Sequence, residues 1–539
     1  MPASAHAHET PRAEIYVDGR IAAATLVGAL ALVVYLLWGT HMLRPWDPLR
    51  LFRPAPRPRR APRSDLPDDA SARALERTPS HAAPYYCGLV NPNVYCFFNS
   101  VVQCLGSLTL LAHYLDDTTR MAEHWNVPTP VTDALRALLV ALNTPYANRR
   151  VLVPRELQAA LARVSQSNGL RTLLGAHQQQ DAHELCVLLV HALDEELGAV
   201  QHTRSQALRT EAAGLSGLVA PSHLVHGQPR TQLGGPGERV ASPFRGTLAQ
   251  RTACGQCGYM EAVRHFSFTD LDLVVPGSAC TLEQCLAAWS QLEQIDWTCH
   301  RCSLRATDAS LGAEVARLEA MPPTARTARR LARVRQQRQR VAAALRSGAH
   351  ESEWEATHAA DPLPHVRALS PAATKQVLLA APPPVLVLHL NRSSFSLGAY
   401  GASKNHARVV FREWLDVTPF TTGAALHTEA FRPLSTRGAR GSVRYQLRGV
   451  VTHYGSHNYG HYVCFRRRPD RTWTRISDEQ VQACTLDDVL AQNPYLLMYE
   501  RADAVARAGD IHEQPLVPVR RARVLHRWDT GAAHVAAHA

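Results

Sequence analysis

The chain has 539 residues, a net charge of +12 and a hydrophobic content of 46%. This hydrophobic content excludes a wholly disordered protein, and the length allows two to four domains, or one large domain with tails. The positive charge favours acidic partners, such as anionic lipid, nucleic acid or an acidic protein, and carries no information about the fold. Twelve cysteines are too sparse for a disulfide framework, and four of them form two CxxC pairs, which favours a reducing compartment and a metal.

The chain begins with a short segment, residues 1–20, followed by an apolar run. Residues 21–38 contain no charged side chain. A helix of this length spans about 27 Å, close to the roughly 30 Å of a bilayer core. Arginines dominate the segment after the run, so the rest of the chain should face the cytosol. We therefore expect a transmembrane anchor over residues 21–40. A cleaved signal peptide is the alternative, and the bulky, basic flank disfavours it.

A Pro- and Arg-rich stretch follows the anchor, and we predict a disordered basic tether over residues 41–84. From about residue 85 to 200 the apolar spacing is helical, as at Leu185 and Leu189. The polar residues 203–245, which include several glycines and prolines, indicate a loop.

The second half of the chain changes pattern three times. A cysteine-containing segment covers about residues 246–305. Residues 314–348 are rich in alanine, arginine and leucine, with eight arginines and no acid after residue 325. We predict an exposed basic helix there, inserted in the fold. A solvated insert is favoured over a nucleic-acid or lipid contact. β-type runs dominate residues 376–501, and the tail, residues 502–539, shows no pattern of a folded unit.

One cysteine stands at the expected start of a helix. In "CFFNSVVQCL" the apolar residues after Cys96 recur at three- and four-residue spacing, which would place its thiol at the positive end of the helix dipole. A buried, inert core residue is the alternative. A nucleophilic cysteine needs an imidazole partner, and "HYGSHNYGHYVCF" offers His453, His457 and His461. A metal site on a helix would also use such spacing, but the glycines and the alternating aromatic pattern favour a strand that fixes His461.

The two CxxC pairs have the spacing that holds tetrahedral zinc through thiolates. They are Cys254 with Cys257 and Cys299 with Cys302, and 41 residues separate them. Because this separation is larger than a small zinc ribbon needs, we expect two knuckles at the tips of neighbouring strands that share one structural zinc ion. Reduced or redox-active thiols are the alternative.

Several motifs together resemble the ubiquitin-specific proteases, the papain-like cysteine deubiquitinases. They occur in the family's order: "GLVNPNVYCFFNSVVQCL", "HQQQDAHELCVLLVHAL", "CGQC", "WTCHRC", "PPPVLVLHLNR" and "YQLRGVVTHYGSHNYGHYVCFRR...TWTRISDEQV". The resemblance implies an α+β catalytic domain over residues 85–501, with a helical thumb, a β-rich palm and zinc-bearing β fingers. With the N-terminal transmembrane helix, the chain resembles the family member anchored in the mitochondrial outer membrane.

The resemblance also implies roles for individual residues. Cys96 matches the nucleophile and His461 the general base. Asn91 matches the asparagine whose amide stabilises the oxyanion, although a turn asparagine is what the residue alone would suggest. Gln180 and Asp181 match the residues that open a helix and bind the ubiquitin tail, and Asp181 also suits a helix N-cap.

The chain departs from the family pattern at two places. The family usually has Gly, Asn and Thr before the nucleophile, whereas this chain has Asn93, Val94 and Tyr95. Asn93 tolerates a positive φ, so the turn can survive. The third member of the triad is normally Asp or Asn, but the aligned residue here is Ser477, with Asp478 beside it. We expect Ser477 to orient the imidazole, and Asp478 could compensate for its missing charge.

The expected function is hydrolysis of the isopeptide bond after the C-terminal glycine of ubiquitin, which releases ubiquitin from conjugated proteins. The expected partners are ubiquitin, ubiquitinated proteins and a membrane, through residues 21–38, and no nucleic acid. The expected location is the mitochondrial outer membrane, with the endoplasmic reticulum as the alternative. There are two competing hypotheses. The first is a catalytically impaired family member that binds ubiquitin. The second is a membrane-tethered protein that binds nucleic acid, although no basic surface interleaved with aromatic residues supports it.

Overall fold

The structure is a computed structural model, and its chain divides into two units, Met1–His81 and Ala82–Ala539. All described residues belong to the second unit, and they are residues 85–92, 94–164, 180–216, 240–260, 262–348, 350–358, 365–395, 402–423, 425–435, 441–456 and 459–511. The expected N-terminal segment, anchor and tether therefore lie outside the described residues, as do Asn93 and His457.

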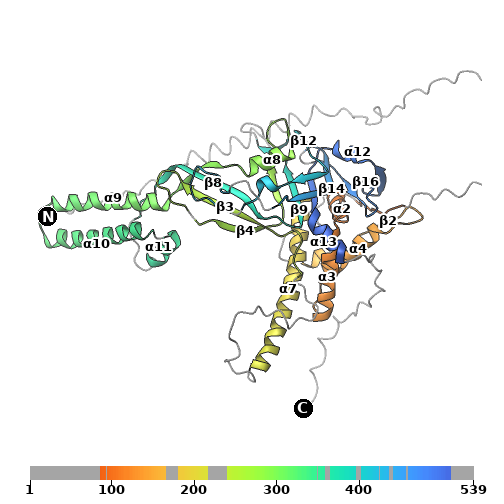
Figure 1. The fold of residues 1–539 in the computed structure, drawn as a ribbon, viewed down its shortest axis with the longest axis horizontal. Coiled ribbons are helices and arrows are strands. Elements are labelled where there is room, and N and C mark those ends of the chain that lie inside the picture. Colours follow the sequence, from red (N-terminus) through yellow and green to blue (C-terminus); the bar gives the residue numbers. More distant parts are fainter. Residues whose placement is uncertain are drawn as a thin grey trace, which may run out of the picture. The chain divides into compact units, whose positions relative to one another are not determined.

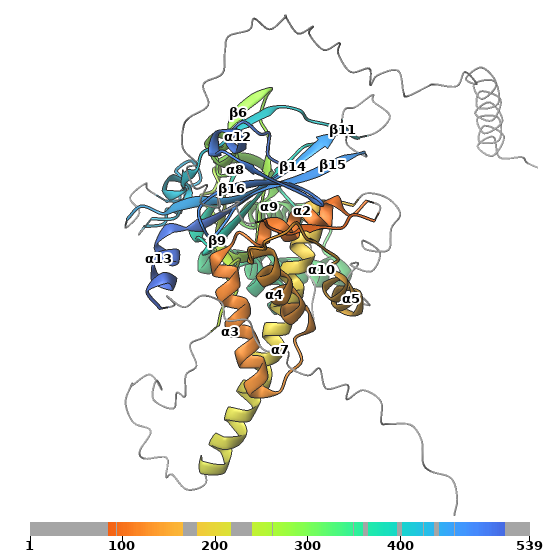
Figure 2. The ribbon, with the colours of Figure 1, turned by 90° about the vertical axis from the view of Figure 1, so that its right-hand side faces the viewer.

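Among the described residues, five helices form the thumb, in agreement with the helical spacing of residues 85–200. They are α2 (Cys96–Leu105), α3 (Thr109–Trp125), α4 (Pro130–Asn143), α5 (Arg155–Val164) and α7 (Ala182–Ser216). In Figures 1 and 2, α3, α4 and α7 run away from the central sheet on the same side of it. The helix α7 extends to Ser216, so the loop expected from residue 203 begins later than predicted.

The palm is an eight-stranded sheet. Its path is β17-β16-β15-β14-β18-β9-β5, and β13 pairs with β14 beside that path. The strands are β5 (Leu271–Val274), β9 (Val385–Asn391), β13 (Trp414–Asp416), β14 (Arg444–Gly455), β15 (Gly460–Arg467), β16 (Trp473–Ser477), β17 (Gln480–Cys484) and β18 (Leu496–Arg501). All pairs are antiparallel except that of β5 with β9.

Both faces of the middle of the palm are covered, which explains why β9 and β18 are continuous apolar runs. Side chains alternate between the faces of a strand. On β9, Val385 and Val387 join the core that contains the thumb helices, whereas Leu386 and Leu388 join a second core on the opposite face. The second core includes residues of α8 (Leu282–Trp289) and of the parallel pair β6 (Ala279–Thr281) and β12 (Arg408–Val410).

The fingers are a four-stranded sheet of order β4-β3-β8-β7. Its strands are β3 (Gly246–Cys254), β4 (Arg264–Phe268), β7 (Glu293–Thr298) and β8 (Leu369–Ala381).

Two short strand pairs lie outside the palm and the fingers. The strand β10 (Ser393–Phe395) pairs with β11 (Ala402–Lys404), and β1 (Gly88–Leu89) pairs in parallel with β2 (Val151–Leu152). Three short helical elements complete the palm region: η3 (Thr418–Phe420), α12 (Leu486–Leu490) and α13 (Ala502–Ile511).

The basic insert is a helical hairpin and not the single helix predicted over residues 314–348. The helices α9 (His300–Glu319) and α10 (Ala325–Ser347) lie side by side beyond the fingers (Figure 1), followed by α11 (Glu351–His358). They share a small apolar core of six buried residues: Leu304, Leu311, Leu318, Val334, Val341 and Trp354. The helix α9 begins within the second CxxC pair. That pair therefore lies where a strand meets a helix, and not at the tip of a strand. The C-terminal tail, in which the sequence shows no pattern of a folded unit, begins with the helix α13 (Ala502–Ile511).

No single helix within the described ranges is long and apolar enough to cross a membrane. The helices α2 and α3 meet the length and composition only when they are taken together, and they are bent by 86° with respect to each other.

Candidate active site

Cys96 is the first residue of α2, as the apolar spacing predicts. The first hydrogen bond of the helix runs from the N–H of Asn99 to the carbonyl of Tyr95 (2.9 Å), and no acidic residue lies in the first turn. The thiol therefore lies at the positive end of the helix dipole, which favours the thiolate. Cys96 is 3% exposed, so this sulfur lies below the surface.

His461 lies near the start of β15, in the palm strand against which α2 packs. The residue before it, Gly460, allows the backbone to approach β14 closely, because a Cβ there would lie 2.1 Å from the carbonyl oxygen of Tyr454. His461 is opposite Tyr454, and His453 is opposite Tyr462. His453 and His461 thus lie on two antiparallel strands, so the alternative of a histidine metal face on a helix is wrong.

The imidazole of His461 contacts both candidates for the third position. Its Nε2 lies 2.8 Å from Oγ of Ser477 and 3.8 Å from Oδ2 of Asp478. The first distance is that of a hydrogen bond and the second is too long for one. Ser477 therefore fixes the orientation of the ring, whereas Asp478 supplies a negative charge nearby. With Nε2 directed at Ser477, Nδ1 is the ring nitrogen that can accept a proton from a thiol.

Asp478 has a second set of contacts that connects it to the nucleophile's helix. Its Oδ2 accepts a hydrogen bond from Nδ2 of Asn91 (3.0 Å), and its Oδ1 accepts one from Nδ2 of Asn99 (2.7 Å). The Oδ1 of Asn91 in turn accepts from the N–H of Tyr95 (2.9 Å). One carboxylate therefore holds the predicted oxyanion residue in place and ties it to the start of α2. An amide nitrogen carries two hydrogens, so the bond to Asp478 uses one of those on Asn91.

Asn99 was not among the residues predicted for the site. It is 2% exposed and lies in α2, whose ten residues are all buried. A polar residue within a largely apolar helical stretch was the signal that could have identified it, because a buried amide needs hydrogen-bond partners.

The turn between β16 and β17 sits close to β1. The N–H of Leu89 donates to the carbonyl of Asp478 (2.9 Å). Gly88 makes this approach possible, because a Cβ there would lie 2.5 Å from the carbonyl oxygen of Glu479. Asp478 itself has φ of 50°, a left-handed conformation that aspartate tolerates better than most residues. The carboxylate is therefore positioned by the backbone of the turn.

Asp181 caps α7, as one of its two predicted roles requires. Its Oδ1 accepts from the N–H groups of His183 (2.7 Å) and Glu184 (3.0 Å), and the hydroxyl of Tyr495 donates to its Oδ2. Burial, with a smaller effect from the charge of Asp181, raises the pKa of Tyr495 above its usual range. Gln180 precedes Asp181 and is half-buried. The role of both residues in binding a ubiquitin tail stays a prediction.

A buried arginine joins the strand of His461 to the helix of Cys96. Arg466 on β15 donates from Nη1 to the carbonyl of Gln103 (3.1 Å), in the last turn of α2, and from Nη2 to that of Leu142 (2.8 Å), at the end of α4. Helix C-termini attract cations. Burial nevertheless lowers the pKa of Arg466 to about 10. The guanidinium thus fixes α2 and β15 relative to each other.

The four cysteines of the two CxxC pairs converge in the fingers. All their sulfurs lie within 4.8 Å of one another, with Cys254 and Cys302 at 3.8 Å and Cys257 and Cys299 at 3.5 Å. Four thiolates at about 2.3 Å from one tetrahedral zinc ion lie at such separations. Cys254 ends β3, and Cys299 follows β7 and precedes α9. The cluster could therefore bind one zinc ion, which would link the strands of the fingers to the α9–α10 hairpin.

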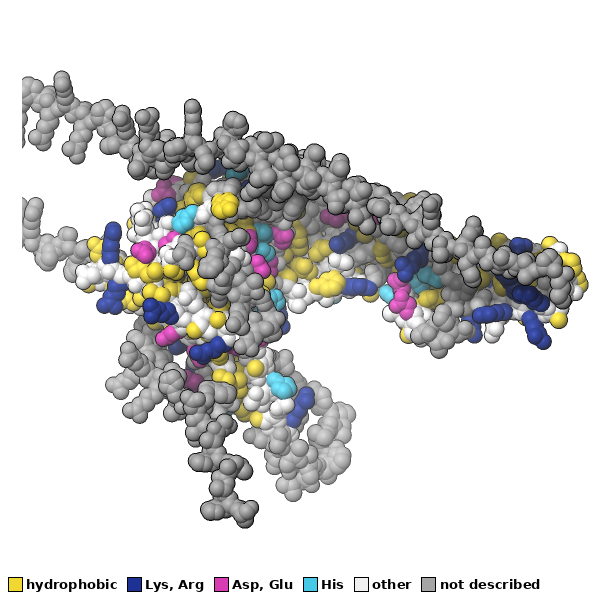
Figure 3. All heavy atoms as spheres, turned by 180° about the vertical axis from the view of Figure 1, so that it is seen from behind, with side chains coloured by type: hydrophobic (Ala, Val, Ile, Leu, Met, Phe, Trp, Pro, Cys, Tyr) yellow, Lys and Arg dark blue, Asp and Glu magenta, His cyan; other side chains and the backbone are white. Residues whose placement is uncertain are grey.

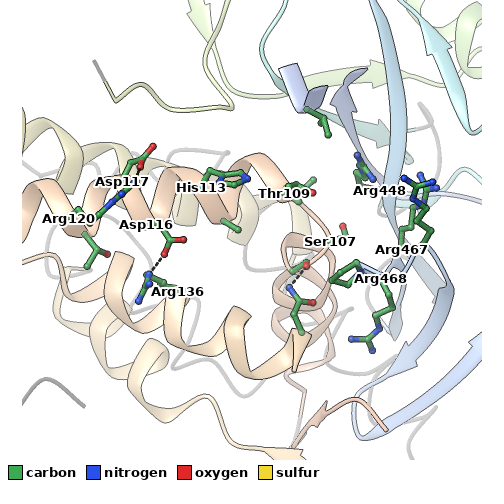
Figure 4. Close-up of a pocket in the computed structure, with 18 of the residues that line it drawn as sticks. Ser107, Thr109, His113, Asp116, Asp117, Arg120, Arg136, Arg448, Arg467 and Arg468 are labelled. Atoms are coloured by element: carbon green, nitrogen blue, oxygen red, sulfur yellow. Dashed lines mark hydrogen bonds and ion pairs between the residues drawn. The ribbon is translucent and has the colours of Figure 1, made fainter. Parts of the chain in front are cut away.

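A separate cavity of about 780 Å³ lies between α3 and the ends of β14 and β15, and it contains none of the residues assigned above (Figure 4). At one end Arg136 pairs with Asp116, and at the other lie Arg448 and Arg467. Arg448 is paired with the buried Glu500 at 2.8 Å. The cavity is therefore distinct from the thiol–imidazole site.

The site combines a thiol at a helix start, an imidazole on the strand that packs against this helix, and an amide bonded both to the helix start and to the carboxylate beside the imidazole. This combination is that of a cysteine hydrolase. The comparisons give the same class. The family model described as "Ubiquitin carboxyl-terminal hydrolase" matches residues 87–499. This chain belongs to that family, which makes it a cysteine-type ubiquitin hydrolase by class.

Three relatives show how far the similarity extends. Ubiquitin carboxyl-terminal hydrolase 1 of Saccharomyces cerevisiae is 27% identical over 53% of this chain and 38% of its own length. Ubiquitin carboxyl-terminal hydrolase 27 of Arabidopsis thaliana is 26% identical over 77% of this chain and 85% of its own. Ubiquitin carboxyl-terminal hydrolase 30 of Xenopus tropicalis is 24% identical over 77% of this chain and 80% of its own.

Proposed function

We propose that the protein removes ubiquitin from conjugated proteins by hydrolysing the isopeptide bond after the C-terminal glycine of ubiquitin. The hydrogen bond between His461 and Ser477, next to the carboxylate that holds Asn91, is the observation that carries the proposal. It supports an imidazole kept in one orientation beside an amide donor, and acyl transfer needs both groups.

The reaction begins with proton transfer. The Nε2–H of His461 donates to Ser477, so that Nδ1 can take the proton of the Cys96 thiol. The thiolate attacks the carbonyl carbon of the terminal glycine, and the carbonyl oxygen becomes an oxyanion. The side-chain amide of Asn91, together with backbone N–H groups, stabilises that charge. A positioned donor of this kind commonly contributes about 3 kcal/mol to the transition state.

The second half of the reaction returns the enzyme to its starting state. The imidazolium of His461 gives its proton to the lysine amine as the carbon–nitrogen bond breaks, which leaves a thioester between Cys96 and ubiquitin. The imidazole then takes a proton from water, and the hydroxide attacks the thioester carbonyl. Ubiquitin leaves with a free carboxylate, and the thiol is restored. Ser477 stabilises the imidazolium less than a carboxylate would, and the charge of Asp478 offsets part of that difference.

Hydrolysis of isopeptide-linked diubiquitin by the purified full chain tests this proposal. We expect monoubiquitin to be released by the wild type and not by Cys96→Ser. If the chain binds ubiquitin but releases none, the competing hypothesis holds. The chain would then be a catalytically impaired family member, with a serine at position 477 in place of Asp or Asn.

We further propose that residues 21–38 anchor the protein in the mitochondrial outer membrane, with the catalytic domain in the cytosol. The uncharged run and the arginines after it support this proposal. Imaging a fluorescent fusion of residues 1–65 tests it. Mitochondrial rims are expected, a reticular pattern would favour the endoplasmic reticulum, and a diffuse cytosolic signal would contradict the anchor.

A further inference from the structure

The α9–α10 hairpin carries most of the excess positive charge of the chain. Residues 300–347 contain eleven arginines, no lysine and three acidic residues, a net charge of +8, compared with +12 for the whole chain. Figure 3 shows these basic side chains gathered towards the free end of the hairpin. Neither the proposed hydrolysis nor the zinc cluster uses them.

The three acids of the hairpin are already engaged. Glu314 pairs with Arg317 and Arg330, Glu319 pairs with Arg335, and Asp308 pairs with Arg338. These pairs hold α10 against α9 and leave no acid in the hairpin for the remaining arginines. None of the ion pairs between described residues includes Arg326, Arg329 or Arg333.

These three arginines form a stripe along one side of α10. At about 100° per residue, Arg326, Arg329 and Arg333 lie within an arc of roughly 60°, and all three are exposed. The buried Val334 and Val341 face α9, so the stripe flanks the helix–helix contact. A groove of about 830 Å³ runs beside it, with Leu311 and Val334 among its lining residues and Arg317, Arg329, Arg330 and Arg333 around it.

The tip of the hairpin is apolar and exposed. Met321 is 42% exposed, and the two prolines that follow it are exposed as well. An exposed apolar tip next to a row of arginines is the arrangement by which proteins lie at a bilayer interface, where the apolar side chains enter the headgroup region and the cations meet lipid phosphates.

The chemistry of this surface favours lipid over nucleic acid. Residues 301–348 contain no Phe, Tyr or Trp, whereas proteins that bind single-stranded nucleic acid or RNA loops stack bases on aromatic side chains. The proposed anchor would also keep a bilayer near.

We propose that the α9–α10 hairpin is a docking surface for anionic phospholipid headgroups, formed by Arg326, Arg329, Arg333 and the tip at Met321. Docking would fix the orientation of the catalytic domain relative to the membrane. The proposal goes beyond the hydrolase activity, and it rests on the proposed anchor only for the proximity of the bilayer.

The test uses the full chain with a donor fluorophore on a bio-orthogonal residue in place of the exposed Ala320, next to the tip, and bilayers that contain an acceptor-labelled lipid. One bilayer is neutral phosphatidylcholine, and the other contains about 30% phosphatidylserine. We expect strong energy transfer only on the anionic bilayer, and its loss in about 0.5 M salt, where the Debye length falls below about 5 Å. The variant Arg326→Gln/Arg329→Gln/Arg333→Gln should weaken the lipid contact roughly 100-fold.

The matched control removes the same charge from the same helix. Arg335→Gln/Arg338→Gln/Arg346→Gln should keep the energy transfer of the wild type, because Arg335 and Arg338 are engaged with acids of α9. All variants should cleave a fluorogenic ubiquitin substrate equally, which shows that they fold. Equal energy transfer on both bilayers, or equal loss in the two triple variants, would overturn the docking surface, as would wild-type capture of RNA that competes with the anionic bilayer.

Flotation separates the docking surface from the anchor. A chain that floats with neutral bilayers has an anchor, whether or not the hairpin docks. If the anchor fails, the wild type floats with anionic bilayers alone, and the first triple variant floats with neither. If the anchor holds, the wild type and both triple variants float with both bilayers, and the energy transfer alone then decides whether the hairpin docks.

Discussion

The hydroxyl of Ser477 lies 2.8 Å from Nε2 of His461, at the end of the strand next to that of the histidine. A serine can orient the imidazole but carries no charge with which to stabilise the imidazolium. The only acid within 4 Å of that ring, among the ion pairs of the described residues, is Asp478, and its carboxylate is hydrogen-bonded to Asn91 and Asn99. Orientation and charge thus come from two adjacent residues.

Replacement of Ser477 tests the orienting bond. Ser477→Ala should lower kcat about tenfold to 100-fold with little change in KM, because the ring loses its fixed tautomer while the ubiquitin contacts remain. Ser477→Asn keeps an acceptor and should restore most of the rate. Stopped-flow hydrolysis of a fluorogenic ubiquitin substrate measures both constants. A rate for Ser477→Ala within twofold of the wild type would assign the orienting role to Asp478.

Asp478 should matter through Asn91 as well as through His461. In Asp478→Asn one acceptor oxygen becomes an NH2 donor, so only one of Asn91 and Asn99 keeps its acceptor, and the negative charge beside His461 is lost. We expect kcat to fall by about 100-fold or more, the magnitude of a lost oxyanion donor. Asn99→Ala should have a smaller effect, and the double variant should be no worse than Asp478→Asn, because the residues act as one network. Strictly additive effects in a double-mutant cycle would contradict the network.

The cysteine cluster should hold one zinc ion. Purified chain should contain about one zinc per molecule by mass spectrometry, and Cys299→Ser should lose it and melt about 10 °C lower. Cys285→Ser is the matched control for metal content, because Cys285 is buried beside Cys280 and outside the cluster. Zinc bound equally by both variants would show that the four sulfurs are not the ligands.

Stability should depend on pH through His183, whose Nε2 lies 2.7 Å from Asp270. Burial alone would lower the pKa of His183, but the hydrogen bond and charge of Asp270 outweigh it and raise this pKa. The same contact lowers the pKa of Asp270 against the effect of burial. The pair therefore stabilises the fold in full below the unfolded histidine value of about 6.5, and this contribution is lost as pH rises through the raised pKa of His183.

Asp270→Asn should accordingly destabilise the protein more at about pH 5.5 than at about pH 8.5, as measured by urea unfolding. At the lower pH the variant buries a charged or desolvated imidazole without its partner. His183→Gln removes the titrating group and serves as the control, since the pH dependence should then disappear. A larger effect of Asp270→Asn at the higher pH would contradict the assignment.

Local patterns in the sequence revealed the elements of the site but not all of its contacts. The start of α2 at Cys96 follows from apolar spacing, and Gly460 indicated the close strand approach at His461. The bond from Asn99 to Asp478 joins residues 379 positions apart, and it depends on the β16–β17 turn, which no local pattern specifies. The positions of Ser477 and Asp478 in the sequence therefore could not show which of them orients the imidazole of His461.

The hairpin shows a different reason for a missed element. Its first helix has leucines only at every seventh position, Leu304, Leu311 and Leu318, with Val315 beside them, so its stripe of large apolar residues is narrower than an ordinary packing face. The adjacent CxxC pair suggested a strand tip instead. The seven-residue spacing, which Val334 and Val341 continue in α10, was the signal for two helices packed along a narrow seam.

The central claim is that Cys96 is the nucleophile, and a ubiquitin probe with a C-terminal electrophile tests it most directly. We predict one covalent adduct per chain, mapped by peptide mass spectrometry to Cys96 and absent in Cys96→Ala, with Cys104→Ala still labelled as a control for a neighbouring buried thiol in the same helix. Absence of an adduct in the folded wild-type chain, or an adduct that persists in Cys96→Ala, would contradict the account.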